Sequence, residues 1–127
     1  GTSIISAQNG GLEVVTGGSL SAVGTTDSKI TFAGEEDVTG YWTGIRFNAA
    51  SANNVLDFAI VANGGSDGFD GANRKANVEV GPDGTATITN SSLLSSGDAG
   101  IRVQSGGSLT QSDNTFTGNL GVDIEFL

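Results

Sequence analysis

Leu12-Glu13-Val14 is the first of five triplets in which a charged residue stands between two apolar residues. The others are Ile45-Arg46-Phe47, Val78-Glu79-Val80, Ile101-Arg102-Val103 and Ile124-Glu125-Phe126. This alternation is typical of a β-strand with one face in a core. The first residues of successive triplets are 33, 33, 23 and 23 positions apart. A unit of 23 residues, enlarged twice by ten residues, predicts a solenoid of stacked coils.

Two further positions recur in the repeat and are apolar except at Asn53. Eight positions after the start of a triplet stand Leu20, Asn53, Ala86 and Leu109, and fifteen positions after it stand Ile60, Leu93 and Phe116. Three strand-like segments per coil, joined by glycine and Asx corners, would stack into three parallel sheets around a narrow core. We therefore expect an all-β fold, a right-handed parallel β-helix solenoid of about four to five coils.

Composition supports an all-β chain and excludes several kinds of chemistry. Glycine supplies 21 of 127 residues and there is one proline, which suits repeated tight turns. The net charge of −9 opposes binding of phosphate backbones, so we expect no nucleic-acid partner. The chain has no cysteine and no histidine, which removes disulfides and histidine-based acid–base catalysis. No apolar run approaches the ~20 residues of a membrane span.

Several segments resemble a known group of proteins. The segments 40–47, 88–91 and 114–119 read GYWTGIRF, ITNS and NTFTGN. They resemble right-handed parallel β-helix repeat domains of bacterial surface and secreted proteins, within the pectate-lyase-like group. That group includes polysaccharide lyases, hydrolases, adhesins and scaffolds without known activity. The resemblance implies an extracellular or cell-surface location, with residues 1–127 forming a single β-helix domain that is a fragment of a larger protein.

Candidate ion ligands occur in the two ten-residue enlargements, the first between Asp27 and Ile45 and the second at residues 64–75. Asp67 and Asp70 lie three residues apart in a glycine-rich loop, where backbone carbonyls are also accessible. Glu35, Glu36 and Asp37 form an acidic turn. Calcium takes six or more oxygen ligands, so either loop is a weak calcium candidate. The alternatives are a flexible Gly/Asp loop and a solvated turn, and we expect no cofactor.

Aromatic residues lie in or beside the same enlargements and are the candidate ligand contacts. They are Tyr41, Trp42 and Phe69. Exposed rings would stack on sugars. The alternative, which we favour for Trp42, is that the ring folds back over the coil, whereas Phe69 is expected to be exposed.

Catalytic groups are scarce, and we assign none. Asp57 and Asp113 share the position twelve after a triplet start, with Asn90 between them, so they would lie two coils apart, roughly 10 Å. Two carboxylates at such a distance suit hydrolysis. The favoured alternative is a stacked Asx ladder that holds a corner. Arg74-Lys75, near Asp67, is the one basic cluster that a lyase reaction could use.

The middle residues of the triplets form a charged row. Glu13, Arg46, Glu79, Arg102 and Glu125 alternate in sign, and we expect them to point to solvent on one sheet. Such a row also discourages the sheet from pairing with other sheets.

The function expected from these patterns is a non-catalytic structural or recognition module, concerned with adhesion or glycan contact. The alternatives are a polysaccharide lyase or glycoside hydrolase of β-helix fold, and a calcium-dependent carbohydrate-binding module. Polysaccharide or another surface protein is the expected partner. Apolar residues at both ends of the chain, Ile4 and Phe126 among them, predict end-to-end self-association through the terminal coils.

Overall fold

The computed structural model describes residues 1–70 and 74–127, and this part of the chain contains fourteen strands and no helix. The strands are β1 (Ser3–Ser6), β2 (Gly11–Val14), β3 (Ser21–Val23), β4 (Ile30–Gly34), β5 (Gly44–Phe47), β6 (Val55–Asp57), β7 (Ala59–Ala62), β8 (Ala76–Val80), β9 (Thr85–Thr89), β10 (Ser92–Leu94), β11 (Ala99–Val103), β12 (Ser108–Ser112), β13 (Thr115–Thr117) and β14 (Ile124–Phe126). The described residues include no helix long and apolar enough to cross a membrane.

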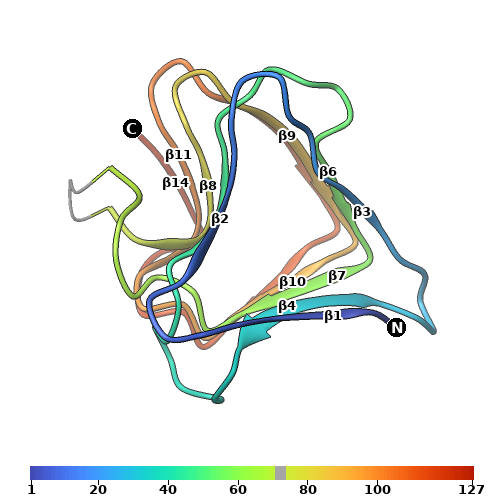
Figure 1. Cartoon of the computed structure of the whole chain (residues 1–127), viewed down its shortest axis with the longest axis vertical. Coiled ribbons are helices and arrows are strands. Elements are labelled where there is room, and N and C mark those ends of the chain that lie inside the picture. Colours follow the sequence, from blue (N-terminus) through green and yellow to red (C-terminus); the bar gives the residue numbers. More distant parts are fainter. Residues whose placement is uncertain (71–73) are drawn as a thin grey trace.

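The strands form three sheets, and every strand pair is parallel. Sheet A has the order β1-β4-β7-β10-β13, sheet B the order β14-β11-β8-β5-β2, and sheet C the order β12-β9-β6-β3. Each coil contributes one strand to each sheet, which gives the triangular cross-section in Figure 1. With the N-terminal coil nearest the viewer, the chain runs clockwise as it recedes, so the winding is right-handed (Figure 1). The predicted parallel β-helix of four to five coils is confirmed.

The triplets build sheet B in the predicted register. Leu12 pairs with Ile45, Ile45 with Val78, Val78 with Ile101, and Ile101 with Ile124. The apolar residues of the inner triplets are buried and join the core. A slip of one residue would turn this whole row outward, so the apolar pattern specifies the register strongly.

The predicted register of sheets A and C is wrong in the second coil, by one residue. Val55 lies opposite both Ser21 and Thr87, one position later than the repeat predicts. Consequently Val61, and not Ile60, pairs with Leu93 and lies in the core. Asn53 is likewise displaced by one position from the predicted row and is exposed.

The extra residue lies in the corner between β5 and β6, and Asn54 accommodates it. The Asn54 side chain is buried and accepts a hydrogen bond from the Leu20 amide at 3.0 Å. Its amide nitrogen donates to the carbonyls of Ala49 and Thr85, at 2.9 and 3.1 Å. The side chain thus bonds backbone groups of three coils, which satisfies them where the local strand pairing is interrupted.

Candidate functional site

The charged row lies on the outside of sheet B with its members in register. Arg46 Nη1 lies 2.8 Å from Glu13 Oε2, and Arg46 Nε lies 3.6 Å from Glu79 Oε2. On the later coils, Arg102 Nη2 lies 3.1 Å from Glu125 Oε2. The predicted alignment of opposite charges on adjacent strands is therefore confirmed.

The expectation that all five side chains point to solvent is wrong for two of them. Glu79 is 2% exposed and Arg102 is 4% exposed, although both point away from the core. The described part of the second enlargement, residues 64–70, 74 and 75, lies on the outer side of sheet B (Figure 1). Arg102 Nη1 donates to the Lys75 carbonyl at 2.8 Å, and Arg102 Nη2 also binds Asp98 at 3.0 Å. The charged row therefore has its more exposed members at its two ends, Glu13 and Glu125, and its less exposed members between them.

One carboxylate of the second enlargement and one of sheet B share the amide of Gln104. Gln104 Nε2 donates to Asp70 Oδ2 at 2.9 Å and also to Glu79 Oε1. Burial raises the pKa of Glu79 above its ordinary value, and the nearby charge of Asp70 raises it further. The hydrogen bond from Gln104 and the charges of Arg46 and Arg102 oppose that rise in pKa. Paired carboxylates of this kind can serve hydrolysis, but a buried Glu79 offers no face to a substrate.

The calcium candidates are engaged in bonds within the protein. Asp67 Oδ1 accepts a hydrogen bond from the Gly68 amide at 2.8 Å, and Asp70 accepts the bond from Gln104. Within residues 1–70 and 74–127, no three acidic side chains gather into a group that could hold a metal ion. The part of the glycine-rich loop at 71–73 lies outside the described residues, and the calcium site stays a prediction.

The three aromatic candidates lie in different surroundings. Trp42 is 2% exposed and its Nε1 donates to the Ala62 carbonyl at 2.7 Å, which confirms that it folds into the coil. Tyr41 is half-buried against Gly34. Burial raises the pKa of the Tyr41 hydroxyl, and the charges of Glu36 and Glu35 add to this.

Phe69 is not fully exposed, contrary to expectation. Its ring is half-buried, and a methyl group at Gly11 would lie 3.0 Å from its Cε1 atom. The absence of a side chain at Gly11 therefore gives the ring a place to pack on the first coil.

The Asx ladder is only partly as predicted. Asp57 pairs with Thr89, so Phe58 stands where Asp57 was expected. Phe58, Asn90 and Asp113 occupy equivalent corner positions with φ values of 50°, 49° and 57°. Asn and Asp adopt this left-handed backbone conformation more readily than most residues, which explains why Asn90 and Asp113 occur at this corner. Asp57 instead accepts hydrogen bonds from Thr89 Oγ1 and Asn90 Nδ2, both at 2.9 Å.

Sequence reasoning missed an array of hydroxyl groups on the outside of sheet C. Ala22, Leu56, Ala86 and Ile88 point into the core, so their alternate neighbours point outward. We call these outward side chains the hydroxyl face: Ser21, Val23, Val55, Asp57, Thr85, Thr87, Thr89, Ser108, Thr110 and Ser112. Asp57 is the one charged member, and seven of the ten carry a hydroxyl. The signal was present in the alternation of Thr85 to Thr89 and of Ser108 to Ser112.

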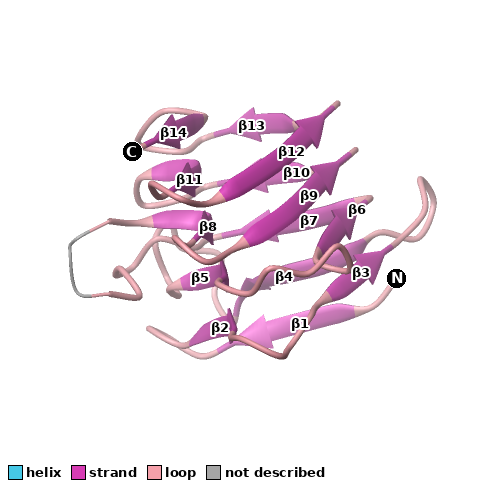
Figure 2. Cartoon of the chain, turned by 90° about the horizontal axis from the view of Figure 1, so that it is seen from above, coloured by secondary structure: helices cyan, strands magenta, loops and turns pink. Residues whose placement is uncertain are grey.

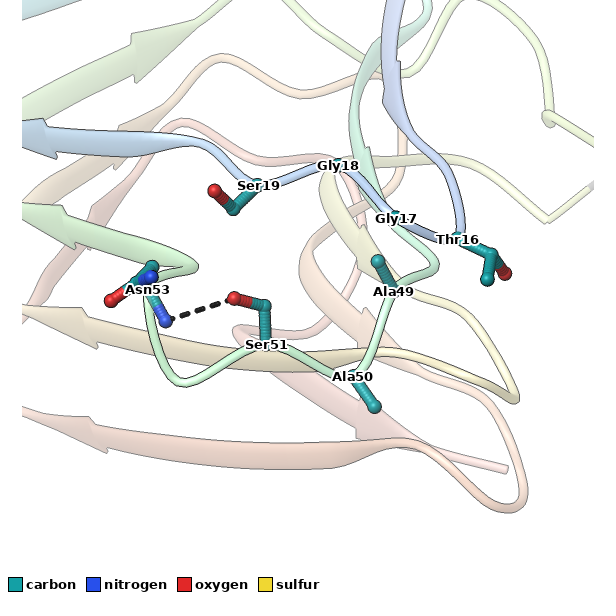
Figure 3. Close-up of a pocket in the computed structure, with 8 residues that line it drawn as sticks. All are labelled: Thr16, Gly17, Gly18, Ser19, Ala49, Ala50, Ser51 and Asn53. Carbon is teal, nitrogen blue, oxygen red and sulfur yellow. Dashed lines mark hydrogen bonds between the residues drawn. The ribbon is translucent and has the colours of Figure 1, made fainter.

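A pocket of about 430 Å³ adjoins the hydroxyl face. It lies between the corners that precede β3 and β6 and is formed by two successive coils (Figure 3). Its lining is uncharged and consists of Thr16, Gly17, Gly18, Ser19, Ala49, Ala50, Ser51 and Asn53. The Asn53 backbone amide donates to Ser51 Oγ at 3.1 Å (Figure 3).

No protein-family model matches this chain, and neither a curated protein nor a solved structure matches it. The parallel β-helix is shown by the structure itself, and function is argued from the surfaces described above.

Proposed function

We propose that this domain is a non-catalytic recognition module of a larger surface or secreted protein, and that it contacts a neutral polysaccharide through the hydroxyl face. The observation that carries this proposal is the chemistry of sheet C. Seven hydroxyl-bearing residues and a single carboxylate point outward from four parallel strands that run side by side (Figure 2).

Hydroxyl rows suit a polymer of sugars for two reasons. Serine and threonine each donate and accept hydrogen bonds, as sugar hydroxyls do. Six of the seven hydroxyl-bearing residues lie on the adjacent strands β9 and β12, where Thr85, Thr87 and Thr89 stand opposite Ser108, Thr110 and Ser112. Adjacent parallel strands are about 4.8 Å apart, so these hydroxyls form three closely spaced pairs. A flat polymer with its own repeat could therefore form several bonds at once.

The charge of the protein favours a neutral polymer. A net charge of −9 repels acidic polysaccharides at long range. The hydroxyl face carries no cation that would compensate, since its charged member is Asp57. The adjoining pocket is also uncharged and extends the same surface at its corner.

The sequence assigns the hydrolase alternative to Asp57 with Asp113 and the lyase alternative to Arg74-Lys75. The structure adds a second carboxylate pair for a hydrolase, Asp70 and Glu79, which share the Gln104 amide. A hydrolase would need both groups beside the scissile bond, and Glu79 is covered by the second enlargement. The calcium-dependent alternative rests on Asp67 and Asp70. Of these candidate residues only Asp57 belongs to the hydroxyl face, where its carboxylate accepts hydrogen bonds from Thr89 Oγ1 and Asn90 Nδ2.

Co-sedimentation with insoluble neutral polysaccharides tests the proposal. We expect the protein to bind at least one of cellulose, chitin and an insoluble β-glucan, and to release no reducing ends. The paired substitutions Thr87→Glu and Thr110→Glu should abolish this binding, because they place carboxylates in the middle of the hydroxyl face.

The matched control carries the same change on sheet A. Thr31→Glu and Thr115→Glu lie on outward positions of β4 and β13 and should leave binding intact. Binding that survives on the sheet C variant, or no binding to any of the polymers, would contradict the proposal. Release of reducing ends that disappears on Glu79→Gln would instead support the hydrolase.

A further inference from the structure

The pocket beside the hydroxyl face lies where two corners of unequal length face each other. Between paired strand positions, the first coil turns from sheet B to sheet C over residues 15–20 and the second coil over residues 48–54. The corner of the second coil is therefore one residue longer. Figure 3 shows the two corners on opposite sides of the pocket, with Ser19 on one and Ser51 on the other.

Hydrogen bonds within the protein hold both corners in place. Asn54 Nδ2 donates to the Ala49 carbonyl and Asn54 Oδ1 accepts from the Leu20 amide, so one buried side chain ties the longer corner to the shorter one. Within the shorter corner, the Gly18 amide donates to the Val15 carbonyl. A site whose shape exists before binding loses less entropy when a ligand is ordered in it. The pocket is such a preformed site.

The side chains of the lining offer hydrogen bonds but no charge and no large apolar surface. They include the hydroxyl groups of Thr16, Ser19 and Ser51 and the amide of Asn53. The remaining lining residues are glycines and alanines, so the pocket has no aromatic ring on which a ligand could stack. Recognition in this pocket therefore depends on hydrogen bonds.

Backbone groups add donors to this lining. The backbone amides of the exposed residues Gly17, Ser19 and Ala50 form no hydrogen bond with any group in the described part of the chain, so they can bond to solvent or to a ligand. Gly17 has a φ of 89°, and a methyl group at this position would have no atom within 4 Å. A ligand can therefore approach this part of the backbone closely.

The size of the pocket and its chemistry together favour one class of ligand. Small-molecule sites commonly have volumes of roughly 300–1,000 Å³, and this pocket of about 430 Å³ is near the lower limit. An uncharged pocket with both donors and acceptors matches a small neutral molecule that carries many hydroxyl groups. A single sugar unit has this chemistry. Ser21, two residues after Ser19, begins the hydroxyl face on β3, so a sugar in the pocket would adjoin a polymer on that face.

We propose that the pocket is a subsite for one neutral sugar unit, at a chain end or a side branch, of the polysaccharide that the hydroxyl face contacts. The inference rests on the proposed function for the polymer, whereas the sugar unit is recognised by the hydroxyl and amide groups of the pocket itself.

Titration of the intact chain with single sugars tests this inference. Glucose, mannose, galactose and N-acetylglucosamine are added separately to the isotope-labelled protein, and the backbone amide signals are followed by NMR. We expect at least one sugar to shift the signals of Gly17, Ser19 and Ala50 in a saturable way. The dissociation constant should be about 1 mM or weaker, since a ligand of so few atoms makes few contacts.

One variant fills the pocket, and two control variants leave it unchanged. Ser19→Phe places a ring in the lining and should raise the dissociation constant about tenfold or more. Ser105→Phe makes the same change on an exposed serine at the corresponding corner of the fourth coil and should bind as wild type does. The paired substitutions Thr87→Glu and Thr110→Glu lie outside the pocket and should also leave the titration unchanged. The dispersion of the amide signals shows whether each variant is folded.

Co-sedimentation with two insoluble β-glucans, one branched and one unbranched, separates a side branch from a chain end. Binding by Ser19→Phe that is weaker than wild type only on the branched polymer assigns the pocket to a side branch. Weaker binding on both polymers assigns it to a chain end. Binding equal to wild type on both polymers would overturn the inference.

Failure of this inference and failure of the proposed function give different results. The inference is overturned if none of the sugars shifts the pocket amides in a saturable way, or if Ser19→Phe leaves the shifts unchanged, even where the protein pellets with a polymer. Saturable shifts in a protein that pellets with no polymer would support the pocket as a sugar site and overturn the role of the hydroxyl face.

Discussion

Sheets B and C are wound from the same coils, yet their outer faces differ in chemistry. Sheet B presents a row of five charged residues, of which Glu79 and Arg102 are covered by an enlargement of the coil. Sheet C presents the hydroxyl face, which carries one carboxylate. The loops that join β3, β6, β9 and β12 to the neighbouring strands of the coil are all shorter than the second enlargement.

The difference shows that the coil constrains only its inward positions. The inward positions of the inner strands are apolar in both sheets, while the edge strand β12 carries the polar Gln111 opposite the buried Ile88. Outward positions vary in residue type, and a loop from one corner can bury outward residues that would otherwise lie on the surface, as it does for Glu79 and Arg102. Substitutions on both sheets test whether burial, and not the sheet to which a residue belongs, determines how much an outward residue contributes to the free energy of unfolding.

The largest effect is expected for Arg102→Met. Arg102 bonds the Lys75 carbonyl and two carboxylates from a position that is 4% exposed. Its loss leaves the carbonyl without this donor, while Asp98 and Glu125, each about one third exposed, regain water. We expect a loss of about 3 kcal/mol in the free energy of unfolding, measured by urea denaturation.

Thr110→Met is the matched control on sheet C. The position is exposed and outward, so the change should stay within about 0.5 kcal/mol. Equal losses of unfolding free energy for Arg102→Met and Thr110→Met would show that burial beneath the second enlargement does not determine the contribution of an outward residue to stability.

The next effect concerns the corner through which the second coil passes from sheet B to sheet C. Asn54→Ala removes three hydrogen bonds to backbone groups, those of Leu20, Ala49 and Thr85. We expect a loss of about 2 kcal/mol by the same measurement. Asn53→Ala, on the exposed neighbour, should cost far less, and similar values for both would refute the bonding role of Asn54.

Glu79 should make stability depend on pH in a defined direction. Its pKa in the folded protein is raised from the ordinary 4.5, chiefly by burial. The folded state therefore holds this proton more tightly than the unfolded state. The stability that the protonated group contributes is complete below pH 4.5 and is lost as pH rises through the raised pKa.

Urea denaturation of wild type and Glu79→Gln between pH 4.5 and 8 measures this, with the ordinary glutamate pKa as the lower limit. The stability of wild type relative to the variant should increase as pH falls, since glutamine does not titrate. A difference that is constant, or that grows toward high pH, would contradict the assignment.

The fold and sheet B could be predicted from the sequence because both depend on inward apolar residues. Leu12, Ile45, Val78, Ile101 and Ile124 recur at separations that only a stacked coil explains. The predicted register of sheet C is wrong in the second coil because the single extra residue in the corner after Phe47 alters no recognisable motif. Its consequence appears only in the pairing of Val55 and in the bonds of Asn54.

The covered part of the charged row could not be predicted. Whether Glu79 is buried depends on the path of residues 64–75, and a glycine-rich segment has no periodicity that defines a path. The hydroxyl face was readable in principle, because Thr85 to Thr89 alternates threonine with inward residues. Its residues are mostly uncharged and none is aromatic, so they lack the side chains that usually mark a binding site in a sequence.

The smallest effect is expected for Glu13→Gln, and it makes the sharpest comparison with Arg102. The Glu13–Arg46 pair, at 2.8 Å, is as close as the Arg102–Glu125 pair at 3.1 Å, and both lie in the same row. Glu13 lies on the edge strand β2 with its side chain 35% exposed and has one partner, whereas Arg102 is 4% exposed and bonds two carboxylates and a carbonyl. Water and salt screen such a pair, so the substitution should cost about 0.5 kcal/mol in dilute buffer and almost nothing in ~1 M salt. Thermal denaturation at the two salt concentrations measures both values. A cost near that of Arg102→Met would mean that the distance between the charges, and not their burial, sets the energy of the row.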